Sequence, residues 1–411
     1  MLLHQHPAVV ALLVAACGDN TCPQRSSDAT CLASRIDGVA IEGQLGFRFG
    51  EPLDLDGDGT GEVVAGARYA GTAGAWSLGQ QVSGWTGEYV DGLFGNVAVP
   101  VPDLDGDGQG DVIVTEPTAV LPDGSRGVVD AYRLDGTRIW QAVGEIDQGF
   151  GWYVARAGDQ TGDGIEDLWV GAPSNPSGGH VYLVSGIDGG VVRAIDGPRE
   201  AGQFGWHIAP LGDLDGDGRA DLAIGAPAAL IAGSYRGQLF VVSATGQILH
   251  TLTGELPDHQ FGIMATALDD LDGDGTPDLA VSAPGGEVDS APGGSEIQLI
   301  SGATGERLRL LTSSTDGELY GRMLALVDDL DDDGLRDLAI GAPWFDAAAG
   351  RVEVRSLRTN RVLVDLRGSE PDSWLGWHIT RAGDAAAGPG LVVSRLHDHE
   401  GRGAIEIHEV R

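Results

Sequence analysis

The sequence predicts an all-β protein, a seven-bladed β-propeller of four-stranded blades closed into a ring. Three observations predict this fold. The 66 glycines and the low aromatic content of 6% favour a turn-rich chain over long helices. An aromatic-glycine signal recurs seven times, the last two in altered form, and each of the first six repeats contains four short apolar segments of strand-like composition.

The recurring signal defines the repeat. Its members lie 45 to 59 residues apart, at Phe49-Gly50, Phe94-Gly95, Phe150-Gly151, Phe204-Gly205, Phe261-Gly262, Tyr320-Gly321 and Leu375-Gly376. Each signal is followed by a short apolar segment, an acidic loop, and a run such as DLAIGAP at Asp221–Pro227. Two further apolar segments complete the repeat, as at Gly237–Ser243 and Ile248–Gly254. Four strands per repeat at this length are typical of a propeller blade.

The two chain ends predict how the ring closes. The seventh repeat supplies three strand segments, Ser373–Ile379, Leu391–Arg395 and Ala404–Val410, and lacks a fourth. The segment Gly38–Gly43 has the right character, so the last blade is expected to be closed by the N-terminal strand, which removes two free sheet edges. The expected domains are a signal peptide with a lipobox over 1–17, a linker over 18–35 and the propeller over 36–411.

Six acidic loops hold their carboxylates in one register. Acidic or polar side chains occupy positions 1, 3, 5 and 9, a glycine occupies position 6, and the backbone carbonyl of position 7 is a further candidate ligand. The expected metal ligands are Asp54, Asp56, Asp58, Thr60 and Glu62; Asp103, Asp105, Asp107, Gln109 and Asp111; Asp159, Thr161, Asp163, Ile165 and Asp167; Asp213, Asp215, Asp217, Arg219 and Asp221; Asp270, Asp272, Asp274, Thr276 and Asp278; and Asp329, Asp331, Asp333, Leu335 and Asp337.

Clustered carboxylates repel one another unless a cation lies among them, and hard oxygen ligands suit Ca²⁺. The pattern is not an EF-hand, because the last carboxylate stands at position 9 and strands flank the loop. About six structural calcium sites are expected, and solvated acidic turns are the alternative. Thr161 should weaken the third site and Glu62 should change coordination in the first. A seventh loop from Asp384 keeps only its first acid, so no ion is expected there.

The net charge limits the classes of partner, and the N-terminus predicts export. A formal charge of -36 argues against nucleic acid, which needs a basic stripe. The apolar run Ala8–Ala16 is too short to span a membrane, and Val14–Cys17 resembles a bacterial lipobox with Cys17 as the lipidated residue. An ordinary signal peptide or a different start is the alternative, because the preceding residues carry no Lys or Arg. Cys22 and Cys31 then form an expected disulfide, or two free thiols in a linker.

The aromatic-glycine signal, the acidic loop and Gly-Ala-Pro, intact at Gly171–Pro173, Gly225–Pro227 and Gly341–Pro343, together resemble the FG-GAP repeat of the integrin alpha-subunit propeller. The resemblance covers about residues 36 to 411. It implies calcium loops on a lower face and ligand contacts on upper-face loops. Applied here, it nominates Arg68, Tyr69, Trp344, Phe345, His397 and His399, with ordinary loop packing as the alternative.

Three tryptophans, Trp152, Trp206 and Trp377, follow their signals in one register, which favours packing between blades over ligand contact. His207 and His378 beside them are expected to be structural.

The expected function is a calcium-stabilised cell-surface binding or adhesion module that recognises a protein or glycan ligand. The alternatives are an enzyme of the cell envelope acting on polysaccharide or lipid, and a purely structural envelope component. No catalytic motif is found, so no enzyme is expected. The protein is expected to be an exported monomer, anchored by lipid to the outer membrane and with no other membrane contact.

Overall fold

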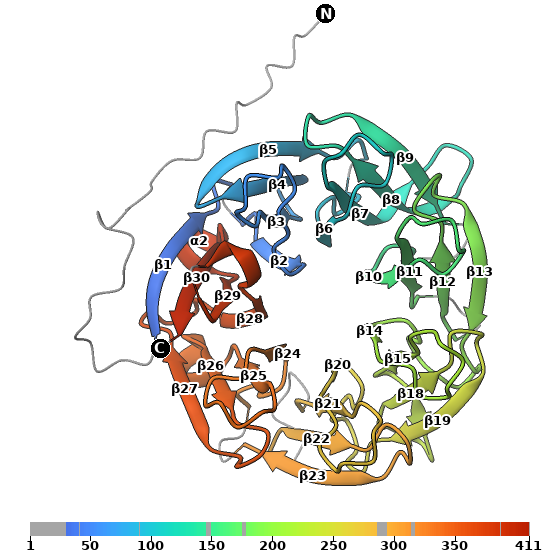
Figure 1. The fold of residues 1–411 in the computed structure, drawn as a ribbon, viewed down its shortest axis with the longest axis vertical. Coiled ribbons are helices and arrows are strands. Elements are labelled where there is room, and N and C mark those ends of the chain that lie inside the picture. The colour runs from blue at the N-terminus through green and yellow to red at the C-terminus, as the bar shows by residue number, and fades with distance from the viewer. Residues whose placement is uncertain are drawn as a thin grey trace, which may run out of the picture.

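The chain folds into a closed ring of β-sheets, a β-propeller, with almost no helix (Figure 1). The computed structural model describes residues 30–40, 42–89, 91–144, 149–174, 178–285, 294–313, 317–386 and 388–410. Figure 1 places β2, β6, β10, β14, β20, β24 and β28 nearest the centre, and β1, β5, β9, β13, β19, β23 and β27 at the outer rim.

Five sheets have four strands each. Their bounds are Thr30–Asp37 (β1), Ala404–Val410 (β30), Gly390–Arg395 (β29) and Leu375–Arg381 (β28); Tyr153–Gly158 (β10), Asp167–Ala172 (β11), His180–Val184 (β12) and Val191–Asp196 (β13); Ile208–Pro210 (β14), Leu222–Ala226 (β15), Gln238–Val242 (β18) and Ile248–Thr253 (β19); Ala265–Ala267 (β20), Leu279–Ala283 (β21), Glu296–Ile300 (β22) and Arg307–Thr312 (β23); and Met323–Val327 (β24), Asp337–Ala342 (β25), Arg351–Arg355 (β26) and Val362–Arg367 (β27).

One further sheet has eight strands. It contains Leu45–Phe49 (β2), Val63–Ala67 (β3), Thr72–Ser77 (β4) and Gln80–Thr86 (β5), then Ala98–Val101 (β6), Asp111–Val120 (β7), Arg126–Tyr132 (β8) and Arg138–Val143 (β9). A single parallel pair, Phe49 with Ala98, joins its two halves. Counted by hydrogen bonding, the described chain therefore does not form seven separate four-stranded sheets. Short elements on the connections are Leu230–Ile231 (β16), Ser234–Tyr235 (β17), Phe345–Ala348 (α1), Gly383–Ala385 (η1) and Asp398–Gly401 (α2).

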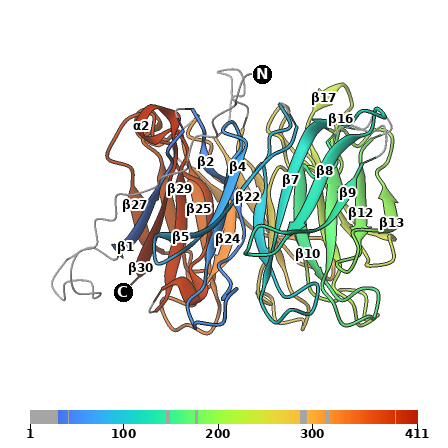
Figure 2. The same cartoon turned by 90° about the horizontal axis from the view of Figure 1, so that it is seen from above.

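The two faces of the ring are distinguished by their loops. Figure 2 shows α2 and the β16–β17 hairpin on the same side of the ring. Both lie between the second and third strands of their sheets, whereas the acidic loops lie between the first and second strands. We call the side with α2 the upper face and the opposite side, with the acidic loops, the lower face.

The ring is closed by the N-terminal strand, as predicted, but by a different segment. β1 pairs antiparallel with β30 from Thr30 with Val410 to Asp37 with Ala404. Gly38–Gly43, the predicted closing segment, follows β1 and leads into β2, and residues 30–35 belong to the sheet instead of the predicted linker. The free edge of β30 supplies the hydrogen bonds that make a strand of this mixed polar sequence.

The predicted position of the first aromatic-glycine signal, Phe49-Gly50, is also wrong. Leu45 pairs with Ala67 as Leu375 pairs with Arg395, and Phe49 lies one position beyond a bulge as Ile379 does. Gly46 has the positive φ of +84° that Gly376 has at +85°, a conformation that favours glycine. Leu45-Gly46 therefore stands where Phe49-Gly50 was predicted.

The core lies in layers between neighbouring sheets. The second strands β3, β11, β15, β21 and β25 are buried along their whole length because sheets cover both of their faces. The signal aromatics Phe94, Phe150, Phe204 and Phe261 are 1–2% exposed in these layers.

Glycines of the two motifs set how closely the sheets approach. The Gly205 N–H donates to the Gly225 carbonyl of the same repeat at 3.1 Å. A Cβ on Gly171 would lie 2.2 Å from the Gly205 carbonyl oxygen of the next repeat, and one on Gly225 would lie 2.1 Å from that of Gly262. Each signal glycine is therefore hydrogen-bonded within its own repeat, and its carbonyl contacts the Gly-Ala-Pro glycine of the preceding repeat. Only a residue without a side chain allows this approach.

Candidate metal sites and ligand-binding face

Each acidic loop is organised around its first aspartate. Asp54 accepts the backbone N–H groups of Gly57 at 2.8 Å and Gly59 at 3.0 Å through its two carboxylate oxygens. The first aspartates of the second to fifth loops accept the equivalent pair. The glycine at position 6 has φ from +84° to +93° in all six loops, so the sharp turn needs glycine there.

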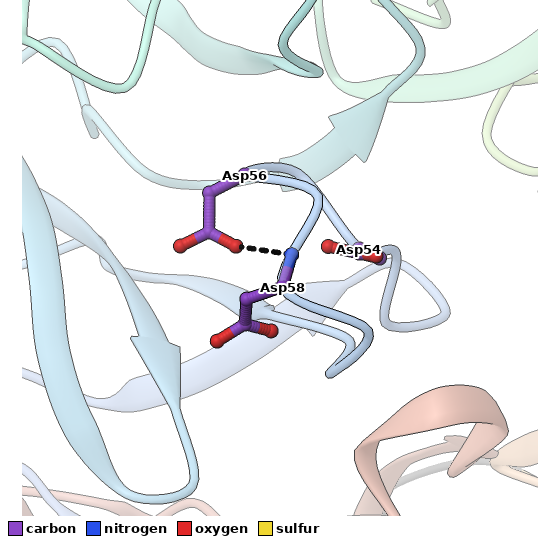
Figure 3. A group of neighbouring side chains, drawn as sticks. All are labelled: Asp54, Asp56 and Asp58. Atoms are coloured by element: carbon purple, nitrogen blue, oxygen red, sulfur yellow. Dashed lines mark hydrogen bonds between the residues drawn. The ribbon is translucent and has the colours of Figure 1, made fainter.

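The structure brings the carboxylates of five loops together. Ligand-capable oxygens lie within 4.8 Å of one another in the groups Asp54, Asp56 and Asp58; Asp103, Asp105 and Asp111; Asp213, Asp215 and Asp221; Asp270, Asp272 and Asp278; and Asp329, Asp331 and Asp333. Figure 3 shows the first group converging on one side of its loop, with the Asp58 N–H donating to Asp56 at 3.1 Å. The third loop is not among the groups found in the described residues, which agrees with Thr161 in place of an acid.

The ninth-position acid is buried in every loop. It closes the loop by accepting the N–H of the second loop residue, as Asp111 does from Leu104 at 2.7 Å and Asp337 does from Leu330 at 2.8 Å. In the third to fifth loops, Asp167, Asp221 and Asp278 use their other oxygen for a backbone N–H beyond the third strand.

The remaining three loops leave that oxygen without a partner. Glu62 Oε1, Asp111 Oδ1 and Asp337 Oδ1 are buried and accept no hydrogen bond in the described chain. A buried carboxylate oxygen with no donor is costly, and a divalent cation would satisfy it.

The electrostatics of the loops show the same deficit of positive charge. Burial, with a smaller contribution from the charges of Asp105, Asp107 and Asp103, raises the pKa of Asp111 to about 7. The hydrogen bond from Leu104 opposes this rise. Burial likewise raises the pKa of Asp337 to about 6. The donor set fits a hard cation, because oxygens only, mostly charged, converge in loops with constrained backbones.

In the second loop, one arginine supplies part of the positive charge that a cation would bring. Arg133 Nε donates to Asp105 Oδ2 at 2.6 Å and lies 3.5 Å from Asp107. Its side chain is 39% exposed, so it can withdraw toward solvent or remain on the outer oxygen when a cation binds.

The upper face holds the predicted ligand-contact residues. Arg68 Nε donates to Gln44 Oε1 at 3.1 Å, and Gln44 Nε2 lies 2.9 Å from His397 Nε2. The His397 ring stacks on Trp374 at 3.9 Å, and Trp374 lies 6.2 Å from Trp344.

Tyr69 is 58% exposed beside Arg68. These four predicted residues thus form one connected surface, whereas Phe345 packs against Arg351 and Arg367 instead. His399 lies in α2.

Residues directly after the signal glycines lie at the upper-face starts of the innermost strands (Figure 1). The innermost strands start on the upper face and end at the acidic loops, so equivalent positions meet around the centre. We call these the mouth residues: Phe47, Asn96, Trp152, Trp206, Ile263, Arg322 and Trp377, followed by Arg48, Val97, Tyr153, His207, Met264, Met323 and His378.

The predicted packing of the tryptophans is confirmed for two of them. The Trp152 and Trp206 rings lie 4.7 Å apart. The third is confirmed as well, because Trp377 packs on Phe47 of the neighbouring sheet at 5.7 Å and also on Trp374 at 5.3 Å. The two histidines are structural, as predicted: His207 Nε2 donates to the Ala265 carbonyl at 2.7 Å and His378 Nε2 to that of Phe49 at 2.8 Å.

Sequence reasoning missed Gln44, Phe47, Arg48, Arg322 and Trp374. All five lie within two positions of a signal glycine, and a correct first register would have aligned Phe47 with Trp152, Trp206 and Trp377.

Other predicted residues lie beyond what the structure tests. Cys17 and Cys22 lie outside the described residues, and the backbone of Cys31 lies in β1. Within the described chain no helix is both long and apolar enough to cross a membrane.

Comparison with solved structures supports the fold alone. One chain in a crystal structure of BBS1N in complex with ARL6DN superposes with a TM-score of 0.57 at 14% identity, covering 93% of this chain and 98% of the other. A second crystal of the same complex gives a TM-score of 0.58 at 13% identity, covering 93% of this chain and 97% of the other.

Comparison with curated proteins finds integrin alpha subunits. Integrin alpha-5 of Xenopus laevis is 31% identical over 228 residues, which is 50% of this chain and 21% of the relative. Human integrin alpha-IIb is 32% identical over 224 residues, 48% of this chain and 20% of the relative. The chain thus spans about a fifth of the length of these relatives.

The FG-GAP repeat family model matches residues 204–242, 263–295 and 321–354. This chain therefore carries FG-GAP repeats in a β-propeller and is similar to integrin alpha subunits over about half its length.

Proposed function

We propose that this protein is a calcium-stabilised propeller that binds a protein or glycan ligand at its upper face. The observation that carries the calcium part is the convergence of carboxylates in five loops, one group of which contains Asp111, whose second buried oxygen has no partner in the described chain. The connected aromatic and arginine surface around Arg68 and Trp374 supports ligand contact on the opposite face, because such side chains are enriched at interfaces. Similarity to integrin alpha subunits also favours a binding module over an enzyme.

All six loops would hold calcium through positions 1, 3, 5 and 9 and the position 7 carbonyl, the third most weakly. Extracellular calcium modules bind with Kd values of about 10⁻⁴ to 10⁻³ M. At about 1 mM calcium each site then contributes roughly 0.4 to 1.4 kcal/mol to the free energy of unfolding, and six sites roughly 2 to 8 kcal/mol. That range is comparable to the net stability of a domain, so the ions are structural.

The ring would consist of seven blades, with the eight-stranded sheet counted as two. Its halves each contain four antiparallel strands in sequence order, and only Phe49 and Ala98 pair across the junction. β2 and β6 both lie nearest the centre, as the first strands of the other sheets do (Figure 1).

The proposal includes the expected export of the chain. Cys17 would carry lipid, Cys22 and Cys31 would form a disulfide, residues before β1 would serve as a tether, and the propeller would act as a monomer at the cell surface. Mass spectrometry of the membrane fraction tests both cysteine assignments: an unmodified N-terminus that retains residues 1–16 contradicts the lipid anchor.

The calcium part is tested by thermal unfolding with excess calcium and with chelator. Calcium should raise the melting temperature and magnesium should not replace it, because magnesium dehydrates reluctantly and demands octahedral geometry. Asp215→Asn removes an acid of the fourth loop and should reduce the calcium effect. Asp188→Asn, an exposed acid in a turn outside the loops, is the matched control. Equal melting temperatures with calcium and chelator would refute calcium stabilisation.

The binding part is tested by an unbiased screen of proteins and glycans against the calcium-loaded chain. A ligand of the upper face should lose affinity when Arg68→Gln is introduced and keep it with Asp188→Asn. A ligand whose affinity is unchanged by Arg68→Gln and Trp374→Ala would contradict the assignment of the face.

A further inference from the structure

A pocket of about 170 Å³ lies at the seam where the ring closes, between the last sheet and the first. Asp37–Ala40, the segment at the end of β1, lines one side, and residues of β4 and β5 line the other. Leu45 and Ala67 also line it. Figure 1 shows this seam at the blue end of the ring, between β1 and the strands β4 and β5. None of the lining residues belongs to an acidic loop or to the surface around Arg68 and Trp374, so the pocket is a separate site.

Small residues in the first repeat account for the pocket. The signal residue is Leu45 here, whereas the second to sixth repeats have a phenylalanine or tyrosine ring. The third residue after the ninth-position acid, Ala65, pairs with Gly74 of the third strand, and Gly74 pairs with Gly84 of the fourth. The third-strand residues at the same register in the second to sixth repeats are Asp130, Tyr182, Phe240, Gln298 and Glu353. The first repeat therefore lacks bulk in three of its four strands.

Large side chains at these positions meet one another in other repeats. The Phe150 ring lies 5.5 Å from that of Tyr182, and the Phe204 ring lies 5.5 Å from that of Phe240. Each pair joins the signal residue to the third-strand residue of the same repeat, and both signal rings pack with residues of the preceding sheet. The first repeat has no such pair, because neither of its residues carries a ring.

Trp76 fills only part of the space that results. Its ring lies over Gly74, where an added Cβ would lie 2.7 Å from Cη2. Its indole N–H is buried and has no acceptor in the described residues, which is unfavourable for a polar group. Val39 and Leu45 add apolar walls, Asp37 adds an exposed carboxylate, and none of the lining residues is basic. The pocket therefore offers an unused buried donor between apolar walls and no basic group for an anion.

We propose that this pocket binds a free, single-ring phenol whose hydroxyl oxygen accepts the indole N–H of Trp76. The volume suits one ring, because an engineered apolar cavity of about 150 Å³ binds benzene. A hydroxyl supplies the missing acceptor, and a neutral group avoids repulsion by Asp37. The ligand contacts both the first and the last sheet, so its binding should raise the melting temperature of the closed ring. This site goes beyond the proposed function and depends neither on calcium nor on the upper-face ligand.

Fluorine NMR tests the proposal with para-fluorophenol and fluorobenzene, which differ only in the hydroxyl group. The full chain is used in saturating calcium, and the broadening of each fluorine signal with added protein gives the affinity. Para-fluorophenol should bind about tenfold more tightly than fluorobenzene, the difference expected for one added hydrogen bond to a buried donor. Fluoronaphthalene, which has two rings, and the anion para-fluorobenzoate should not bind.

Variants that refill the pocket test its location. Leu45→Phe restores the ring of the other repeats, so it should weaken para-fluorophenol binding about tenfold or more at an equal or higher melting temperature. Leu375→Phe, the same change at the seventh signal, is the matched control, because Leu375 does not line the pocket. Gly84→Thr fills the pocket from β5, where an added Cβ would press only on the flexible Gln81 side chain, at 2.8 Å. Its control is Ala194→Thr, at the same register of the third repeat. Both controls should leave the affinity unchanged.

Trp76→Phe tests the hydrogen bond. It keeps a ring and removes the N–H, so para-fluorophenol and fluorobenzene should then bind with similar affinity. A tenfold preference for para-fluorophenol that survives Trp76→Phe would contradict the assigned donor. No binding of para-fluorophenol, or equal affinities for the wild type and Leu45→Phe, would overturn the site. Tighter binding of N-acetyltyrosinamide than of para-fluorophenol would overturn the choice of a free phenol over a tyrosine of a protein partner.

Discussion

Replacing Arg48 with methionine should stabilise the protein, although it removes a hydrogen bond and three aromatic contacts. Burial, together with repulsion from Arg322 and Arg68, lowers the pKa of Arg48 from 12.5 to about 9, and this difference corresponds to destabilisation of the charged form in the folded state on the order of 5 kcal/mol. Contacts with three aromatic rings return about 1.5 to 3 kcal/mol, and the hydrogen bond to Trp152 about 1 kcal/mol. Methionine fills a similar volume, and the Trp152 carbonyl keeps its bond from Asn96. The expected net gain is about 1 kcal/mol, with an upper limit near 3 kcal/mol.

Urea unfolding in saturating calcium measures this gain, with Arg48→Lys as the control. Lysine keeps the buried charge and loses the planar contacts, so it should lower the free energy of unfolding. A stability loss of 2 kcal/mol or more with Arg48→Met would refute the reasoning, since it would mean that the guanidinium is fully compensated in the folded state.

Three further predictions concern closure, the acidic loops and pH. A chain that starts at residue 38 lacks β1 and should melt at a markedly lower temperature than one that starts at residue 30; equal melting temperatures would contradict closure by Thr30–Asp37. Asp111→Asn should reduce the calcium-dependent gain in unfolding free energy by roughly 0.4 to 1.4 kcal/mol, and should not destabilise the chelated protein, because it removes a buried acid whose pKa is raised to about 7; equilibrium dialysis should find one fewer bound calcium. His207 has a folded pKa of about 3, below its unfolded value of 6.5, so the unfolded state binds the extra proton between these values and stability falls as pH falls. From pH 7 to pH 5, urea unfolding of the wild type should lose about 2 kcal/mol more than that of His207→Gln, and parallel pH profiles would show that the imidazole is not buried neutral.

Much of the fold could be predicted because the residues that define each strand and loop lie within a single repeat. Glycines, β-branched runs and registered acids occur within single repeats, so strands and acidic loops could be placed without knowledge of long-range contacts. In the first repeat, Phe49-Gly50 matches the signal in residue type but not in spacing. The signal glycine stands eight residues before the first loop aspartate in the other repeats, as Gly95 does before Asp103, and only Gly46 satisfies this before Asp54.

The closing strand and the mouth were harder to predict for a physical reason. Residues 30–35 have no clear strand periodicity, and their extended form is imposed by the edge of β30, whose paired residues lie 367 to 380 positions away in sequence. The unpaired state of Arg48 likewise depends on which side chains other repeats bring to the centre. Neither property is visible within one repeat.

The pairing of β1 with β30 also determines how the ring responds to mechanical load. Thr30 pairs with Val410, so these two residues lie together at one end of the β1–β30 ladder. A force that pulls these two residues apart breaks the hydrogen bonds of the ladder one after another, from Thr30 toward Asp37. A pull that separates these two residues would therefore open the ring first at its closing strand.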